Sequence, residues 1–258
     1  MPALSVSAEK TVSSTELAFE AVGGRTAVVR CRAATPLKIL APRHAGTAAW
    51  ACASSHGGGL LSGDSVAVTI DVRAGARQTL AAAVAADGLL VVAPDPVVCY
   101  AGARYAQRQE FDLAPSASLV IVDWLTWGRA PRGERWRFES YESRLAVRRG
   151  GKALLRDATL LDHEAGPLAE RLGRFDVVAL ALATGPLMSA GARALLEEIA
   201  RRPAPRRAPL VVSAAPVGSD GALLRVAAES FEDAARELRR ALAFAWAALG
   251  DDPWSSRA

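Results

Sequence analysis

Metal-binding and strongly nucleophilic side chains are scarce in this chain of 258 residues, which has three histidines, three cysteines and two methionines. Cys31, Cys52 and Cys99 are odd in number and have no paired spacing, which indicates reduced thiols in a cytoplasmic protein. His44, Cys52 and His56 lie close in sequence, but their spacing matches neither half of a structural zinc site. We therefore expect no tightly bound metal or other cofactor.

Long apolar runs and a strong charge imbalance are also missing. Hydrophobic residues make up 51% of the chain, yet the apolar segment Ala241 to Leu249 has only half of the roughly 18 residues that a membrane span requires. The net charge of +4 is too small to indicate nucleic-acid binding. We interpret the one arginine cluster, Arg201, Arg202, Arg206 and Arg207, as a solvated loop, with contact to an acidic partner as the alternative. The N-terminus has no secretory signal pattern, so we expect a cytoplasmic protein that binds neither membrane nor nucleic acid.

The common catalytic motifs are absent as well. Gly150-Gly151-Lys152 is followed by Ala153, where a P-loop needs a hydroxyl group for Mg²⁺. The glycine-rich residues 57–63 precede Asp64 and a predicted strand rather than a helix, so they indicate a tight turn and not a phosphate loop. No G-x-S-x-G nucleophile motif occurs. The sequence therefore gives no support for a nucleotide hydrolase or a serine hydrolase.

Alternation of apolar and polar residues dominates the first two-thirds of the chain. In residues 65–72 the apolar side chains Val66, Val68, Ile70 and Val72 fall on one face of a predicted strand. Glycine- and proline-containing turns separate the predicted strands, which favours a mainly β protein. Similar runs occupy Arg25 to Arg32, Ala48 to Ser54, Leu89 to Ala93, Tyr105 to Leu113, Ser118 to Leu125 and Arg135 to Val147.

Two helices are predicted in the C-terminal half. The first covers Pro186 to Arg202. The second covers Ser230 to Leu249, where Ser230 and Asp233 resemble a capping box. Further strands are expected at Pro209 to Ala215 and Leu223 to Ala227. Because no linker separates these elements, we expect one domain over residues 1–258.

Three aspartates stand in unusual positions. Asp64 follows a glycine at a strand start, Asp123 interrupts an otherwise apolar strand, and Asp157 closes the segment 153–157. A carboxylate inside an apolar strand is costly to bury unless it is paired or faces water or a cation. Each aspartate could instead point outward or meet an arginine such as Arg129 or Arg156.

The order and spacing of short motifs along nearly the whole chain resemble the urease accessory protein UreD family, also called UreH. After Gly75-Ala76-Arg77, residues 78–87 form an alanine-rich stretch where members of the family usually have another hairpin. Residues 57–64 match its GG-[LV]-x-x-GD element, and residues 93–103 match its LPxPxIxFxGA segment. The remaining matches are Gly24-Arg25-Thr26, Thr35-Pro36-Leu37-Lys38, Ala41-Pro42, Leu113-Ala114-Pro115, Asp123-Trp124, Gly128-Arg129 with Gly133-Glu134-Arg135, Ser143-Arg144-Leu145 with Val147, Leu154-Leu155-Arg156-Asp157, and a closing helix before Trp-Ser-Ser-Arg.

The resemblance implies a non-enzymatic, β-helix-like scaffold. It implies binding to apo-urease and UreF, and to UreG through UreF, and assistance with nickel insertion into the urease active site. By motif, the acidic residues of an internal nickel passage would be Asp64, Asp123 and Asp157, so nickel would be a metal in transit. Oxygen ligands in weak, water-filled sites release Ni²⁺ more readily than thiolate or multi-histidine cages, which agrees with this role.

Two other functional classes stay open. A β-rich module that binds protein or carbohydrate would use exposed aromatic side chains, and Trp124, Trp127 and Trp136 are the candidates. Trp124 and Trp127 are three residues apart, hence on opposite faces of a strand, which argues against a shared platform. A small hydrolase would need two convergent carboxylates in a cleft, and the sequence alone does not locate such a pair.

Overall fold

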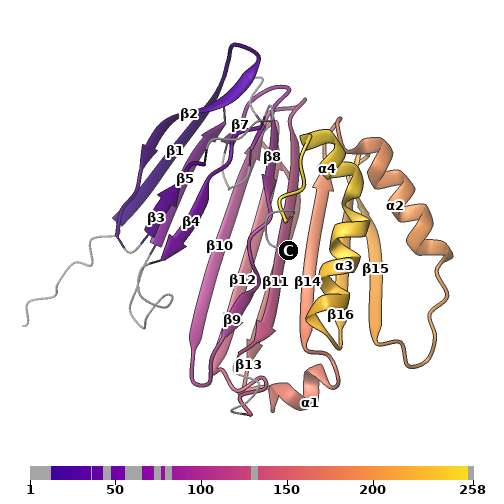
Figure 1. The fold of residues 1–258 in the computed structure, drawn as a ribbon. Coiled ribbons are helices and arrows are strands. Elements are labelled where there is room, and N and C mark those ends of the chain that lie inside the picture. Colours follow the sequence, from indigo (N-terminus) through magenta and orange to yellow (C-terminus); the bar gives the residue numbers. More distant parts are fainter. Residues whose placement is uncertain are drawn as a thin grey trace, which may run out of the picture.

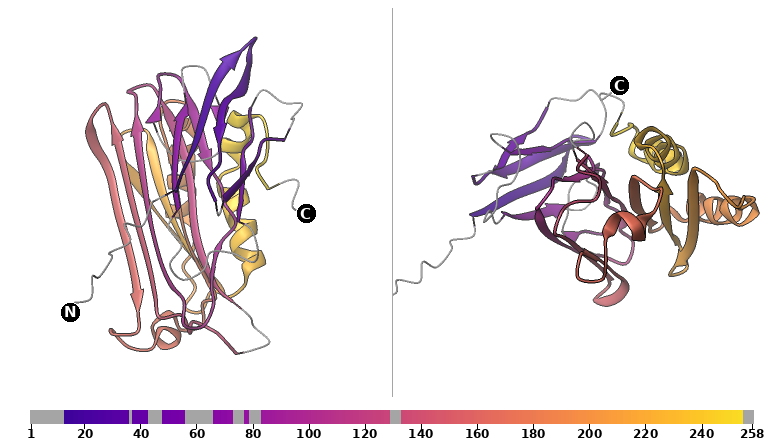
Figure 2. Two further views of the ribbon diagram at one scale, coloured as in Figure 1. Left: turned by 90° about the vertical axis from the view of Figure 1, so that its left-hand side faces the viewer. Right: turned by 90° about the horizontal axis from the view of Figure 1, so that it is seen from below.

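The computed structural model describes residues 13–35, 37–42, 48–55, 66–72, 77–78, 83–128 and 133–254. Two seven-stranded sheets pack face to face, and three of the helices cover the far side of the second sheet (Figures 1 and 2). The expectation of a mainly β protein is therefore confirmed.

The first sheet has the strand order β13-β12-β10-β7-β5-β1-β2. Its long strands at one end alternate buried or half-buried inward residues with more exposed outward ones, as a sheet with one solvated face requires. A separate two-stranded sheet pairs β3 (Leu37–Leu40) with β4 (Cys52–Ser55). The strands of the first sheet are β1 (Ser13–Val22), β2 (Arg25–Arg32), β5 (Val66–Val72), β7 (Ala83–Val84), β10 (Arg104–Leu113), β12 (Ser140–Arg149) and β13 (Lys152–Asp162).

The second sheet has the order β15-β16-β14-β11-β8-β6, and β9 also pairs with β11. Between β5 and β12 the chain crosses repeatedly from one sheet to the other, with parallel pairing inside each sheet. No regular solenoid is found in the part of the chain that the structure describes, so the β-helix-like detail is not confirmed. The strands are β6 (Arg77–Gln78), β8 (Leu89–Val92), β9 (Val97–Cys99), β11 (Ser118–Trp127), β14 (Val177–Thr184), β15 (Leu210–Val217) and β16 (Gly221–Ala228).

Four helices occur among the described residues, where two were predicted. The first predicted helix is α2 (Ser189–Arg201). The second is divided into α3 (Phe231–Ala241) and α4 (Ala243–Leu249) at Leu242, and α1 (Leu168–Leu172) was not predicted. The Ser230 Oγ accepts a hydrogen bond of 3.1 Å from the Asp233 backbone N–H, which confirms the predicted cap. None of the helices in the described ranges has the length and apolarity needed to span a bilayer.

The two faces of β11 contact different apolar cores, one on the helix side and two between the sheets. Val120, Val122 and Trp124 pack with α2, α3 and α4 in one continuous core. Leu119 and Ile121 on the opposite face belong to a core between the two sheets, whereas Leu125 belongs to a second core between the sheets, around Trp136 and Phe138. We call the face of the second sheet that contacts the first sheet its inner face. Asp123 lies on this inner face, between the two inter-sheet cores.

Candidate functional site

Asp123 enters the interior because the pleat of β11 directs every second side chain toward the first sheet. Its sequence neighbours on the same face are Ile121 and Leu125, both buried. The carboxylate is half-buried and accepts hydrogen bonds from β10 and β12, the strands that lie opposite. The possibility that Asp123 points outward is therefore wrong.

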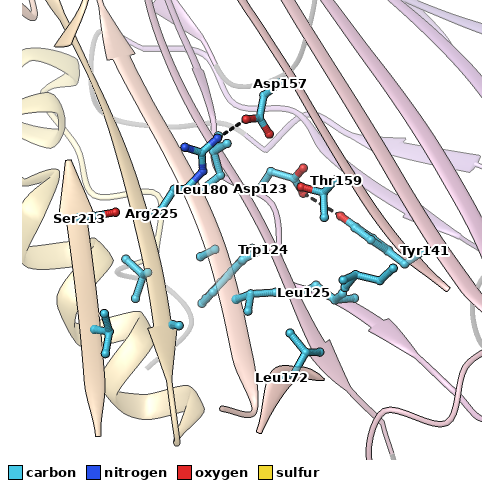
Figure 3. A pocket seen from close by; sticks show the side chains of 16 residues that line it. Asp123, Trp124, Leu125, Tyr141, Asp157, Thr159, Leu172, Leu180, Ser213 and Arg225 are labelled. Carbon is cyan, nitrogen blue, oxygen red and sulfur yellow. Dashed lines mark hydrogen bonds and ion pairs between the residues drawn. The ribbon is translucent and has the colours of Figure 1, made fainter. Parts of the chain in front are cut away.

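Three neutral groups bind the Asp123 carboxylate. Gln107 Nε2 donates to Oδ1 at 2.8 Å, and the Ser143 hydroxyl donates to Oδ2 at 2.6 Å. The Tyr141 hydroxyl donates to Oδ1 at 3.3 Å (Figure 3). No arginine or lysine contacts Asp123 in the described ranges, so the partners that the structure gives its carboxylate are neutral dipoles.

The phenol groups beside Asp123 stay protonated at physiological pH. Burial raises the pKa of Tyr141, and the negative charge of Asp123 raises it further. Burial is also the main cause that raises the pKa of Tyr105, whose hydroxyl donates to Gln107 Oε1 at 3.2 Å. These side chains therefore act as O–H donors that orient Gln107 and Asp123.

The pairing registers place Asp123 in a polar layer across the interior. On the second sheet, Asp123 aligns with Leu180, Arg225 and Ser213 along one row of paired residues. On the first sheet the corresponding row of paired residues consists of Gln107, Ser143 and Thr159. Asp157 occupies the next inward position of β13, two residues before Thr159. This layer separates the two inter-sheet apolar cores. We define the polar layer as Gln107, Asp123, Ser143, Asp157, Thr159 and Arg225.

Asp157 belongs to the same layer but has a different partner. Its side chain, 15% exposed, forms an ion pair with Arg225 of the second sheet, which is 56% exposed (Figure 3). The suggested partner Arg156 is its neighbour on β13 and has an exposed side chain. Because successive residues of a strand point to opposite faces, Arg156 and Asp157 lie on opposite sides of the first sheet. For Asp157 the alternative of an arginine partner is therefore correct, but the partner is Arg225 rather than Arg156.

A cavity of about 320 Å³ lies between the sheets, beside the polar layer. Asp123, Asp157, Tyr141, Thr159 and Arg225 line it together with apolar side chains from β14, β15 and β16 (Figure 3). The cavity therefore brings together two of the three aspartates that the sequence singled out. Asp64 lies outside the described residues.

The described residues hold no group of three or more histidine, cysteine or acidic side chains that could form a metal cage. The buried thiol of Cys99 lies in the core around Trp136. Burial raises its pKa from 9.0 to about 11, so the group is a neutral thiol and a poor metal ligand at physiological pH. The cavity thus offers a divalent cation oxygen ligands only.

Sequence reasoning missed the partners of the aspartates. Gln107 and Ser143 lie at inward positions of alternating strands, and Arg225 interrupts the apolar strand β16. The criterion that selected Asp123, a charged residue in an apolar strand, would also have selected Arg225, but not Gln107 or Ser143, because their strands contain many polar residues. Their convergence on one layer depends on the strand order, which the sequence pattern does not give.

The three tryptophans considered for a carbohydrate platform lie in cores. Trp124 and Trp136 are buried, and Trp127 packs half-buried against the core around Trp136. Trp124 lies instead on the helix side, where its ring stacks on Phe231 at 5.2 Å between centroids. An aromatic platform built from these residues is therefore wrong.

Comparisons of the sequence with a family profile and with individual proteins find similarity to the same family. A family profile described as UreD urease accessory protein matches residues 12–83 and 74–257. A urease accessory protein UreD of Sorangium cellulosum is 48% identical, over 95% of this chain and 84% of that protein. One from Anaeromyxobacter sp. is 42% identical over 91% of this chain and 86% of that protein. Urease accessory protein D of Oryza sativa subsp. japonica is 32% identical over 98% and 97%, respectively.

Proposed function

This chain belongs to the UreD family of urease accessory proteins, and we propose that it assists nickel insertion by passing Ni²⁺ between its two sheets. The family is non-catalytic and acts in urease maturation, which confirms the expectation that the chain is not an enzyme. The observation that carries the proposal is the Asp123 carboxylate, which faces the inter-sheet cavity and is bound by three neutral donors within the described part of the chain.

The chemistry of the cavity suits a metal in transit. Ni²⁺ accepts carboxylate, hydroxyl and water oxygens, but a site with few charged ligands and no thiolate or imidazole cage releases it readily. Asp123 and Asp157 would attract the cation, and water in a cavity of about 320 Å³ would complete its coordination. Asp64 is proposed as a third acidic residue of the path on the strength of its motif.

In the cell, the chain would act as one domain in a cytoplasmic complex. Its partners would be apo-urease and UreF, with UreG bound through UreF and supplying the nucleotide hydrolysis that this chain lacks motifs for. The repeated crossing of strands between two parallel-paired sheets is the feature that favours the β-helix-like description over a simple sandwich.

The test is urease activation in cells that coexpress urease, UreF, UreG and variants of this chain. Asp64→Ala, Asp123→Ala and Asp157→Ala are each expected to lower nickel-dependent urease activity by at least about tenfold, the scale of lost metal-site contacts. Capture of apo-urease by Asp123→Ala and Asp157→Ala should be unchanged, because the side chains of Asp123 and Asp157 face the interior. Full activation by all three variants would refute the passage.

A further inference from the structure

Arg225 is the one cationic side chain among the described residues that line the inter-sheet cavity. It projects from the inner face of β16 and forms the ion pair with Asp157 on the opposite sheet. Its register neighbours on β14 and β15 are Leu180 and Ser213, which carry no charge. Asp157 is therefore the acidic group that the structure gives to Arg225.

The two aspartates of the cavity are held in different ways. Asp123 is bound by Gln107, Tyr141 and Ser143, which are neutral and need not move to let a cation approach the carboxylate. Asp157 already has a counter-ion, the guanidinium of Arg225. The side chain of Arg225 is 56% exposed, whereas that of Asp157 is 15% exposed.

We propose that Arg225 is a displaceable placeholder cation that occupies Asp157 until a divalent metal ion replaces it. This inference rests on the proposed passage and assigns its regulation to one residue. Arginine does not lose its proton in proteins, so its charge can leave the carboxylate only if the side chain moves. Because more than half of that side chain is already exposed to solvent, it can rotate outward, and water then solvates the guanidinium in place of Asp157.

The charges in the cavity explain why a metal ion would replace the Arg225 guanidinium at Asp157 rather than bind beside it. With Arg225 in place, the two carboxylates and one guanidinium leave a single negative charge in the cavity. A divalent ion would neutralise both carboxylates, but it would repel the nearby guanidinium. Competition by Arg225 therefore lowers the affinity for the metal ion and helps to release it, which a carrier of a metal in transit requires.

The experiment measures binding of Ni²⁺ alone to the full chain by equilibrium dialysis. Arg225→Gln should tighten binding by about tenfold, the factor expected if the guanidinium occupies Asp157 about nine-tenths of the time. Arg225→Lys retains the charge and should stay close to the unmodified chain. Arg144→Gln is the matched control, because Arg144 pairs with Glu142 on the solvent side of β12.

The outcomes separate this inference from the passage itself. Unchanged or weaker binding by Arg225→Gln, while Asp157→Ala weakens binding, would overturn the placeholder and leave the passage standing. Equal tightening by Arg225→Gln and Arg225→Lys would also overturn it, because the charge would not be the cause. If Asp123→Ala and Asp157→Ala both bind Ni²⁺ like the unmodified chain, the passage fails and the placeholder fails with it.

Discussion

The two faces of β11 differ in composition: one is entirely apolar in its central part, and the other contains a charged residue. The face toward the helices is continuously apolar from Val120 to Trp124 and belongs to one core with α2, α3 and α4. The inner face has the same spacing, but Asp123 divides it into two cores. Burial of apolar area stabilises the sheet from the helix side, so the inner face can hold a polar layer without loss of the fold. One strand thus serves stability on one face and the proposed passage on the other.

The largest expected effect comes from the helix face. Trp124→Ala removes a buried ring that contacts Phe231 and Trp254, and it removes a hydrogen bond of 2.9 Å from Nε1 to the Pro94 carbonyl. The free energy of unfolding should fall by about 3–5 kcal/mol, measured by denaturant titration. Leu160→Ala on the exposed side of β13 is the control and should change it by less than about 0.5 kcal/mol. Similar losses for both variants would contradict the assignment of stability to the helix face.

The second largest effect on the free energy of unfolding is expected at Arg149, which lies between the two sheets at the end of β12. Arg149 donates to both oxygens of Asp220 at 2.8 Å and to the Thr184 hydroxyl at 2.8 Å, which fastens the β12–β13 hairpin to the β15–β16 hairpin. Arg149→Met would leave the largely buried Asp220 without its cationic partner, at a cost of about 3 kcal/mol, the low end for buried ion pairs. The same titration measures it, and a loss below about 1 kcal/mol would show that the hairpins are held by apolar packing alone.

A smaller effect is expected inside the polar layer. Asp123→Asn replaces a half-buried charge with an amide whose oxygen can still accept from Gln107 and Tyr141. The free energy of unfolding should change by less than about 1 kcal/mol, since loss of the charge reduces its desolvation cost. A loss as large as that of Trp124→Ala would mean that the layer is a structural element and would remove the contrast between the two faces.

The smallest effect on the free energy of unfolding at neutral pH is expected from ionisation of the Cys99 thiol. Its pKa of about 11 in the folded chain exceeds the ordinary value of 9.0, so folding favours the neutral thiol. This stabilisation is complete below pH 9 and is lost as the pH rises through 11. At pH 8 a thiol reagent should modify Cys31 and Cys52 quickly, because they are exposed, and Cys99 only after unfolding. Rapid reaction of all three thiols would show that this part of the interior is open.

Local sequence patterns predicted much of the fold. The bounds of β2 and the start of β11 agree with the predicted runs, because alternation and flanking turns are local signals. The apolar strand β14 was not assigned, since a continuous apolar run does not distinguish a strand from a buried helix. The break at Leu242 was missed because no glycine or proline marks it. There the Leu242 carbonyl accepts from the N–H groups of both Ala245 and Trp246.

The candidate site was predictable only in part. Asp123 was found because a charged residue in an apolar strand is a local anomaly. Its donors and the partner of Asp157 depend on which strands face each other, and Arg225 is 68 residues from Asp157 in the sequence. Pairing over such a separation follows from the sheet order, which no single strand encodes.

The most direct test compares an aspartate that lies between the two sheets with one on the solvent side of the first sheet. Asp123→Asn alters the interior, whereas Asp112→Asn alters an exposed residue of β10 that pairs with Arg148. Urease from cells that carry each variant would be purified and its nickel content measured per active site. The account predicts at least about a tenfold lower nickel content with Asp123→Asn and normal content with Asp112→Asn. Equal, full nickel content in both would contradict a passage between the sheets.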